Sequence, residues 1–292
     1  MKRSIAMMVT LAALTVACAE TGAGSLGTAP GMDPASPSAS PPGASPSSPP
    51  ASPTPARTVT YELWFTHDGS LFVTHRSEPF TPAVGALALE ALLDGPAGAE
   101  REANLGTSID PGTQLLGLTI DDGVATVDLD AAFTAQETPA IAVGSLSQVV
   151  YTLTQFERVD GVLFEVEGVP LTNFGGYGID GPQRRADFAD QLPWILVQSP
   201  TIAERVSSPV RISGTANVFE AVVSIAILDR QGRTVASTFT MATCGTGCRG
   251  TYETDVRYDV DATQPGTIRV YEVSAMDGSS INVVDIPVTL TA

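Results

Sequence analysis

Hydrophobic and polar residues alternate in two short runs on either side of a turn signal. The runs are Thr58 to Thr66 and Leu71 to Arg76, and His67-Asp68-Gly69 lies between them. Such alternation is typical of half-buried strands, and Asp-Gly favours a two-residue hairpin loop. With that loop, Phe65 lies opposite Phe72. The pattern therefore predicts an antiparallel β-hairpin.

Two later segments have hydrophobic residues at helical spacing. Thr81 is a suitable N-cap and Pro82 fits the first helical position, while Gly95-Pro96 would end the helix. Thr138-Pro139 opens a second helix in the same way. The apolar stripes expected to face the core are Val84, Leu87, Ala88, Ala91 and Leu92 in the first helix, and Leu146, Val149, Val150, Leu153 and Phe156 in the second.

A second hairpin and a final strand complete this half of the chain. Gln114 to Ile120 and Val124 to Leu129 flank the turn Asp122-Gly123, and Val162 to Val166 follows the second helix. The order ββα-ββα-β predicts an α/β domain over residues 58–170, with its helices on one face of a sheet.

The pattern becomes all-β from Pro193 onward. Residues 171–192 are Gly-rich and then charged, and they predict a linker. Seven short strands in about 100 residues are typical of a sandwich, so the whole chain is expected to be α+β, with residues 193–292 as its sandwich domain. The candidate strands are Trp194 to Gln198, Val210 to Gly214, Val222 to Asp229, Thr234 to Met241, Gly250 to Arg257, Thr267 to Ala275 and Val283 to Leu290.

The N-terminus has the pattern of an export signal. Residues 1–17 combine Lys2 and Arg3 with a hydrophobic run that is shorter than the 20 or so residues of a membrane-spanning helix. Thr15-Val16-Ala17-Cys18 then resembles a lipobox, in which the Cys18 thiol accepts a diacylglyceryl group. We therefore expect a signal peptide over 1–17 and palmitate-type acyl chains at Cys18, which anchor the protein on the outer face of the cytoplasmic membrane.

The segment after the leader is rich in Pro, Ser and Ala. Residues 18–57 cannot bury enough apolar surface to form a core, so we expect a disordered tether between the lipid and the folded part. Ala17-Cys18-Ala19 also fits the site of ordinary signal peptidase. Cleavage after Ala19 would release a secreted protein instead.

The charge of the chain limits its partners. There are 15 Lys and Arg residues against 32 Asp and Glu, and loss of Lys2 and Arg3 with the leader changes the formal charge from −17 to −19. An acidic surface argues against nucleic acid as a partner. Lys2 is the only lysine, which excludes lysine chemistry from the mature protein.

The sequence offers few candidates for catalysis or metal binding. His67 and His75 would lie about 17 Å apart on a straight hairpin, too far to share a metal ion. Asp128 and Asp130 share one strand face and could bind calcium or flank a glycosidic bond, although a solvated face or a turn is the simpler interpretation. The remaining acidic candidates, which lack EF-hand spacing, are Asp255, Asp259 and Asp261.

No nucleophile elbow, Walker loop or His-Glu-x-x-His segment is present. We therefore predict no catalytic residue, no metal and no cofactor. Cys244 and Cys248 flank Gly245-Thr246-Gly247, and in an exported protein this spacing favours a disulfide across a hairpin end. A reactive thiol pair is the alternative.

Two resemblances to known families follow from longer motifs. Residues 88–96 (ALEALLDGP), 111–116 (PGTQLL), 123–130 (GVATVDLD) and 148–156 (QVVYTLTQF) resemble the GerMN domain of sporulation and spore-germination proteins. Residues 208–221 (SPVRISGTANVFEA) resemble the immunoglobulin-like domain of bacterial spore germination.

The resemblances imply a protein that is not an enzyme. Both families are envelope modules, so we expect a cell-envelope lipoprotein that presents two interaction or assembly domains to envelope or membrane proteins. The alternative is a protein that binds or modifies peptidoglycan, supported by the aromatic residues Trp64, Tyr177 and Trp194. Of these, Trp64 and Trp194 are expected in the core.

Overall fold

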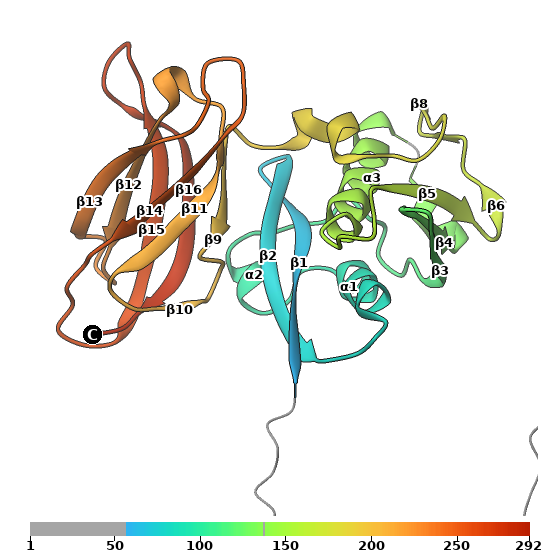
Figure 1. Cartoon of the computed structure of the whole chain (residues 1–292), viewed down its shortest axis with the longest axis horizontal. Helices are drawn as coiled ribbons and strands as arrows, with labels where there is room; N and C mark the ends of the chain where they lie inside the picture. Colours follow the sequence, from blue (N-terminus) through green and yellow to red (C-terminus); the bar gives the residue numbers. More distant parts are fainter. Residues whose placement is uncertain (1–56, 137) are drawn as a thin grey trace, which may run out of the picture. The chain divides into compact units, whose positions relative to one another are not determined.

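The computed structural model describes residues 57–136 and 138–292 (Figure 1). The predicted signal peptide, the lipidation site Cys18 and nearly all of the predicted tether lie outside the described residues. Within the described ranges, no helix is long and apolar enough to cross a membrane.

The first hairpin forms in the predicted register. Strands β1 (Thr58–His67) and β2 (Ser70–Pro79) pair as a two-stranded sheet, with Phe65 opposite Phe72. Asp68 and Gly69 form the turn with positive φ angles of 50° and 80°. A primed turn requires this left-handed backbone, and Asp and Gly adopt it at low cost.

A four-stranded sheet lies apart from this hairpin. Its strands are β3 (Leu115–Asp121), β4 (Val124–Leu129), β5 (Gly161–Val166) and β6 (Val169–Pro170), in the order β3-β4-β5-β6. Strands β4 and β5 are parallel, because a long helix connects them. The predicted order of elements is confirmed, but the two hairpins belong to separate sheets.

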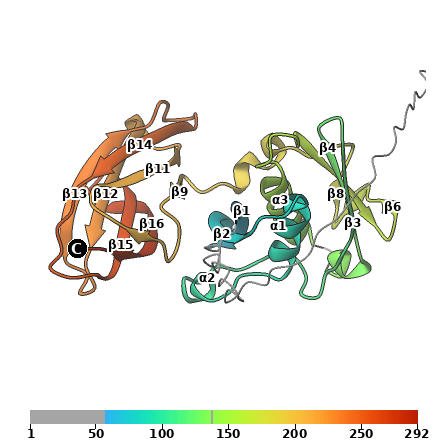
Figure 2. The same cartoon turned by 60° about the horizontal axis from the view of Figure 1, so that its bottom comes forward.

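Two helices, one on each side of residues 94–138, lie between the hairpin and the four-stranded sheet (Figure 2). Helix α3 (Pro139–Leu153) begins as expected, since the Thr138 hydroxyl accepts a hydrogen bond from the Ile141 amide. Helix α1 (Val84–Leu93) begins later than predicted. A one-turn helix, α2 (Ala99–Glu102), follows it.

The predicted N-cap of α1 is wrong. The Thr81 hydroxyl accepts a hydrogen bond from the Ala83 amide, two residues on, and closes a local turn. The first helical hydrogen bond therefore runs from Leu87 to the Ala83 carbonyl, and Ala83 has no side-chain cap to offer.

Helix α3 satisfies the backbone of β1 along the edge that β2 does not pair. The Gln148 side chain donates to the Trp64 carbonyl at 3.0 Å, and the Thr152 hydroxyl accepts from the Trp64 amide at 3.2 Å. One turn on, Gln155 accepts from the Glu62 amide and donates to the Glu62 carbonyl. These three side chains supply the hydrogen bonds that a neighbouring strand would otherwise give, so the peptide groups of Glu62 and Trp64 are paired on this edge.

The side-chain amide of Gln148 also holds the loop at residues 107–108. The Gln148 side-chain oxygen accepts hydrogen bonds from the Ser108 amide at 2.7 Å and from the Thr107 hydroxyl. Gln148 itself is fully buried. One side chain therefore joins α3, β1 and the loop before β3.

Residues 171–192 contain short elements. Two short strands, β7 (Asn173–Phe174) and β8 (Tyr177–Gly178), pair with each other, and a 3-10 helix, η2 (Arg185–Gln191), packs against α3. Arg185 donates to the Tyr151 carbonyl and the Thr154 hydroxyl, and its guanidinium lies over the Trp64 and Tyr151 rings. The buried side chains of the segment are Phe174, Ile179 and Phe188.

The C-terminal region is a two-sheet sandwich, as predicted. One sheet has the order β10-β16-β15-β12-β13 and the other the order β14-β11-β9. Ile212, Ile225 and Ile268 are fully buried between them. The strands are β9 (Ile195–Ser199), β10 (Arg205–Val206), β11 (Val210–Ala216), β12 (Val222–Leu228), β13 (Thr234–Met241), β14 (Gly250–Val256), β15 (Gln264–Val273) and β16 (Ser280–Leu290), and a short 3-10 helix, η3 (Phe219–Ala221), precedes β12.

Cys244 and Cys248 form a disulfide in the connection between β13 and β14. The loop they close docks on the segment before β12. The Thr246 amide donates to the Val218 carbonyl at 3.0 Å, and the Gly247 amide donates to the Asn217 side chain at 2.9 Å. The disulfide therefore shapes a loop that other backbone contacts also hold.

We predict that Gln148→Leu lowers the free energy of unfolding by about 2 kcal/mol or more, because the Trp64 carbonyl and the Ser108 amide lose their buried partners. Urea denaturation of the lipid-free protein measures the change. Gln114→Leu is the control, since Gln114 is exposed and we expect a change within about 0.5 kcal/mol there. Equal effects of the two variants would contradict the role of Gln148.

We predict that the double variant Cys244→Ser/Cys248→Ser folds but loses about 2 kcal/mol of stability, because the disulfide closes a very short loop. Denaturation with and without a reducing agent measures this loss. The reducing agent should destabilise the wild-type protein to the level of the double variant and leave that variant unchanged. Unfolding of the double variant in the absence of denaturant would refute this prediction.

Candidate functional site

The two histidines stay apart, as the sequence predicts. His67 is at the turn end of β1, with its Nδ1 atom 3.5 Å from the Asp68 carboxylate. His75 lies opposite Glu62 in the middle of the hairpin. Within the part of the chain that the structure describes, no group of three His, Cys, Asp or Glu side chains is placed to hold a metal ion.

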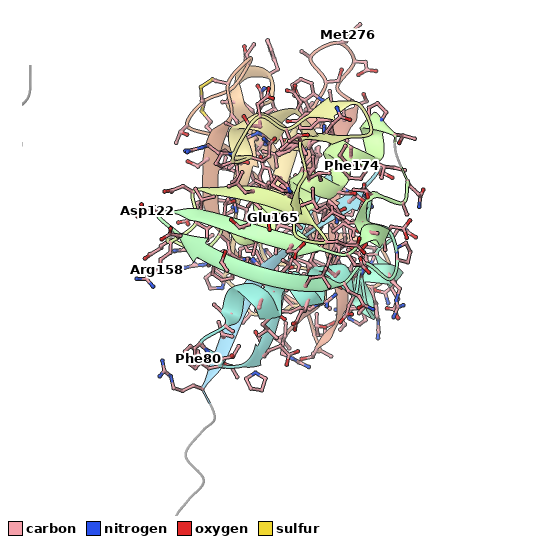
Figure 3. All side chains as sticks on the ribbon, turned by 90° about the vertical axis from the view of Figure 1, so that its right-hand side faces the viewer. Phe80, Asp122, Arg158, Glu165, Phe174 and Met276 are labelled. Carbon is pink, nitrogen blue, oxygen red and sulfur yellow. A yellow bond between two sulfur atoms is a disulfide. The ribbon has the colours of Figure 1, made fainter. Side chains whose placement is uncertain are left out.

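Asp128 and Asp130 support the backbone around β4. The Asp128 carboxylate accepts a hydrogen bond from the Gly168 amide at 2.9 Å, and Asp130 accepts one from the Gln114 amide at 3.0 Å. In register, Glu165 on β5 lies beside Asp128, on the sheet face that Figure 3 shows. The two aspartates thus hold the backbone of neighbouring segments at the end of the sheet.

A shallow hollow lies beside these carboxylates. It has a volume of about 400 Å³ and is lined by Glu165, Asp180 and mostly apolar neighbours. Asp128 and Asp130 are not among its lining residues. Hydrolysis of a glycosidic bond needs two carboxyl groups on opposite sides of the bond. The predicted pair does not supply them, because Asp128 and Asp130 accept hydrogen bonds from backbone amides outside the hollow that Glu165 and Asp180 line.

Of the other acidic candidates, Asp255 forms an ion pair with Arg211. Asp122 is in the turn between β3 and β4, with a φ of 46°. Arg211 donates to both carboxylate oxygens of Asp255, at 3.0 and 3.2 Å, and these hydrogen bonds hold the pKa of Asp255 below its usual value.

The three aromatic candidates differ in their surroundings. Trp64 is buried, as predicted. The Tyr177 hydroxyl hydrogen-bonds to the Gln183 side chain at 3.1 Å. Trp194 was expected in the core, and that prediction is wrong, because its side chain is 59% exposed. It directly precedes β9, and its carbonyl accepts from the Asn217 amide while the side chain stays outside.

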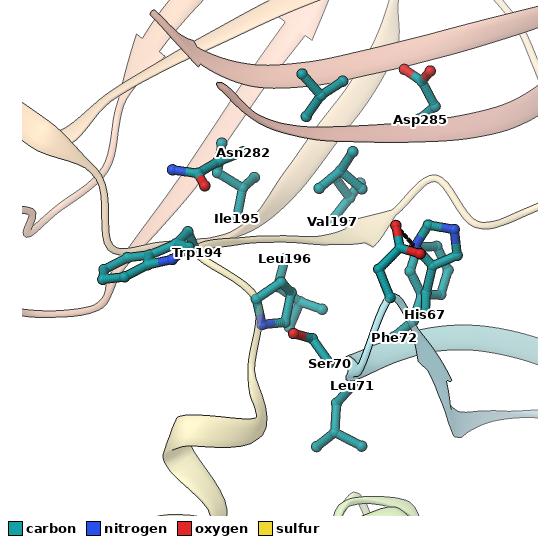
Figure 4. Close-up of a pocket in the computed structure, with 14 residues that line it drawn as sticks. His67, Ser70, Leu71, Phe72, Trp194, Ile195, Leu196, Val197, Asn282 and Asp285 are labelled. Carbon is teal, nitrogen blue, oxygen red and sulfur yellow. Dashed lines mark ion pairs between the residues drawn. The ribbon is translucent and has the colours of Figure 1, made fainter. Parts of the chain in front are cut away.

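Trp194 lies at one end of a pocket of about 160 Å³ (Figure 4). His67 and Asp68 from the hairpin turn line the pocket from one side, and Asn282 and Asp285 from β16 line it from another. An exposed indole beside carboxylate and amide groups can stack on a flat ligand face and hydrogen-bond to its edge. Such a pocket is suited to binding.

The pocket contains a serine, a histidine and an aspartate, but they are not arranged for catalysis. Figure 4 shows the Ser70 hydroxyl turned away from His67, and among the described residues no side-chain hydrogen bond joins the two. Nucleophilic catalysis needs the base within hydrogen-bond reach of the nucleophile. Sequence reasoning missed this pocket because its walls come from residues more than 200 positions apart.

Two family models match the chain. Residues 63–172 match the family described as sporulation and spore germination. Residues 194–279 match the family described as the immunoglobulin-like domain of bacterial spore germination. A search of curated proteins gave no match.

Solved structures with GerMN domains are also similar. The first GerMN domain of the sporulation protein GerM from Bacillus subtilis is 25% identical, with a TM-score of 0.37, and the alignment covers 44% of this chain and 99% of that domain. The tandem GerMN domains of the same protein are 18% identical, with a TM-score of 0.39, over 80% of this chain and 61% of theirs. The two family matches lie on the α/β domain and on the sandwich, in the order predicted from the motifs. Residues 63–172 are thus similar to the sporulation and spore germination family, and residues 194–279 are similar to the immunoglobulin-like domain of bacterial spore germination.

Proposed function

We propose that this protein is a non-catalytic cell-envelope lipoprotein whose two domains serve as interaction or assembly modules. The observation that carries the proposal is how the polar residues of the GerMN-type motifs are used. Gln148, Thr152 and Gln155 bond to the backbone of β1, and Asp128 and Asp130 bond to turn amides. The motifs therefore build a scaffold.

The family matches support a role associated with sporulation or germination. Both families consist of structural domains that are not known enzymes. With the motif residues used in the scaffold, the exposed surfaces are left for recognition. We propose envelope or membrane proteins as the partners, and an acidic surface disfavours nucleic acid.

The N-terminal sequence supports a position at the membrane. Lipidation of Cys18 would hold the folded domains on the outer face of the cytoplasmic membrane, with residues 18–57 as the connection. Both domains would then face the cell wall and the outer surfaces of membrane proteins.

We predict that Cys18→Ala moves the protein from the membrane fraction to the soluble extracytoplasmic fraction and abolishes labelling by a fatty-acid analogue, because the acyl acceptor is lost. Immunoblotting of cell fractions and in-gel detection of the label measure the two effects. Cys244→Ala/Cys248→Ala is the matched control and should stay labelled at the membrane. An unlabelled wild-type protein would refute the anchor.

The assembly role is tested by crosslinking in cells. A C-terminally tagged copy is crosslinked and purified from membranes, and the captured proteins are identified by mass spectrometry. We expect a small, reproducible set of envelope proteins. Turnover of cell-wall glycan or peptide by the purified protein at an enzymatic rate would overturn the proposal.

A second function, peptidoglycan binding, is favoured by one observation: Trp194 is exposed beside Asp68 and Asn282 in a pocket. It predicts that soluble peptidoglycan fragments quench Trp194 fluorescence and that Trp194→Ala weakens binding at least tenfold by calorimetry. Phe80→Ala, which removes an exposed aromatic side chain outside this pocket, should bind like the wild type. Failure of the wild-type protein to bind these fragments would eliminate this second function.

A further inference from the structure

The five-stranded sheet of the sandwich has an outer face that is unusually apolar. Alternation along β15 puts Ile268 and Val270 in the core, so Tyr271 and Val273 point to the other side. The same alternation assigns side chains of β12, β13 and β16 to that side. We call this set the outer face; it comprises Val222, Phe239, Met241, Tyr271, Val273 and Val283.

The outer face is continuous and exposed. Ser224 pairs with Phe239 on one side and with Tyr271 on the other, so these two rings flank it on neighbouring strands. Ser224 is only 8% exposed although it belongs to the outer side of the sheet, whereas Phe239 is 67% and Met241 63% exposed. Large apolar side chains therefore form an exposed cluster at one end of the outer face.

The charge pattern of this sheet side differs from that of the whole chain. Acidic residues outnumber basic ones by 32 to 15 in the sequence. On the outward positions of β12, β13, β15 and β16 the only charges are Arg269 and Asp285, which lie opposite each other in register. They form two hydrogen bonds of 2.8 and 2.7 Å and are each about 40% exposed. These four strands therefore add no net charge to the outer face, and Arg205, on edge strand β10 opposite Thr289, is the remaining outward charge of the sheet.

The lack of net charge at the outer face limits which partners can bind there. A strongly basic or acidic partner finds no complementary charge here, and desolvating its own charges is costly. Two copies of this chain carry the same net negative charge, and that charge opposes their approach least at an uncharged face. After a two-fold rotation, Arg269 of one copy can face Asp285 of the other, so the charge pair complements itself.

We propose that two copies of this chain pack through their outer faces, with Phe239 and Met241 in the contact and Arg269 facing the second copy's Asp285. The proposal goes beyond the function proposed above, because it requires neither the lipid anchor nor an envelope partner. One sheet face lies at the low end of specific interfaces, roughly 1,000 Å² in total, so the dimer is weak and concentration-dependent. Copies confined to one membrane would meet at raised effective concentration.

Analytical ultracentrifugation of the exported chain from residue 18 onward, carrying Cys18→Ala to keep it lipid-free, tests the proposal. We expect a monomer–dimer equilibrium that Phe239→Asp weakens at least tenfold. Phe80→Asp introduces the same charge at an exposed phenylalanine elsewhere and should leave the equilibrium unchanged. Thermal melting of each variant shows that it is folded.

A charge-exchange experiment tests the two-fold arrangement separately. Arg269→Asp and Asp285→Arg should each prevent self-association, since each places like charges opposite one another. An equimolar mixture of the two variants should dimerise again, because two acidic groups then face two basic groups. Loss of packing alone would not give this rescue.

Three results would overturn the proposal. They are a wild-type chain that remains monomeric up to about 1 mM, a dimer that Phe239→Asp does not weaken, and a mixture of the charge variants that stays monomeric. The fractionation and crosslinking results for the proposed function do not depend on any of these outcomes.

Discussion

The α/β domain depends on hydrogen bonds between helix side chains and the free edge of a strand. A two-stranded hairpin leaves one edge of each strand unpaired, and in the interior an unpaired peptide group costs about 1–3 kcal/mol. Here α3 covers that edge of β1, and Gln148, Thr152 and Gln155 supply donors and acceptors at helical spacing. The helix can pack against the strand edge because its buried side is partly polar.

The side chains of α3 also hold other elements of the domain in place. Gln148 also bonds to the loop at Thr107 and Ser108, and that loop leads toward the four-stranded sheet. Arg185 in turn joins η2 to the end of α3. Helix α3 is therefore the element to which the hairpin, the loop before β3 and the segment after β8 are all bonded. The polar residues of the family motifs are used in this way.

Local signals in the sequence were sufficient for most elements. Asp68-Gly69 fixed the hairpin register because a two-residue turn admits one pairing. Alternation located every strand of the sandwich except β10, which has only two residues and so shows no alternation. The prediction that Thr81 caps the first helix was wrong because its hydroxyl accepts from the Ala83 amide, which lies before the helix. The prediction that Trp194 lies in the core was wrong because hydrophobicity alone does not show where a strand begins. Strand β9 begins one residue later, at Ile195.

Other features could not be predicted because they are not local. Gln148 interrupts an apolar stripe, and only its partners, 40 and 84 positions away, explain its burial. The pocket beside Trp194 and the outer face likewise depend on which strands become neighbours. Phe239 on β13 and Tyr271 on β15, for example, lie on either side of Ser224 because both strands pair with β12, and nothing in their own segments indicates it.

The direction of β1 also determines how the domain would bear mechanical load. Any tension that reaches the folded part from its N-terminal side enters at Thr58, at the open end of the hairpin and far from its turn. The hydrogen bonds to β2 run across the strand, so a pull along β1 strains many of them together. The side-chain bonds from α3 to Glu62 and Trp64 lie across the same path. The strand that receives the force is thus held on both edges, in shear.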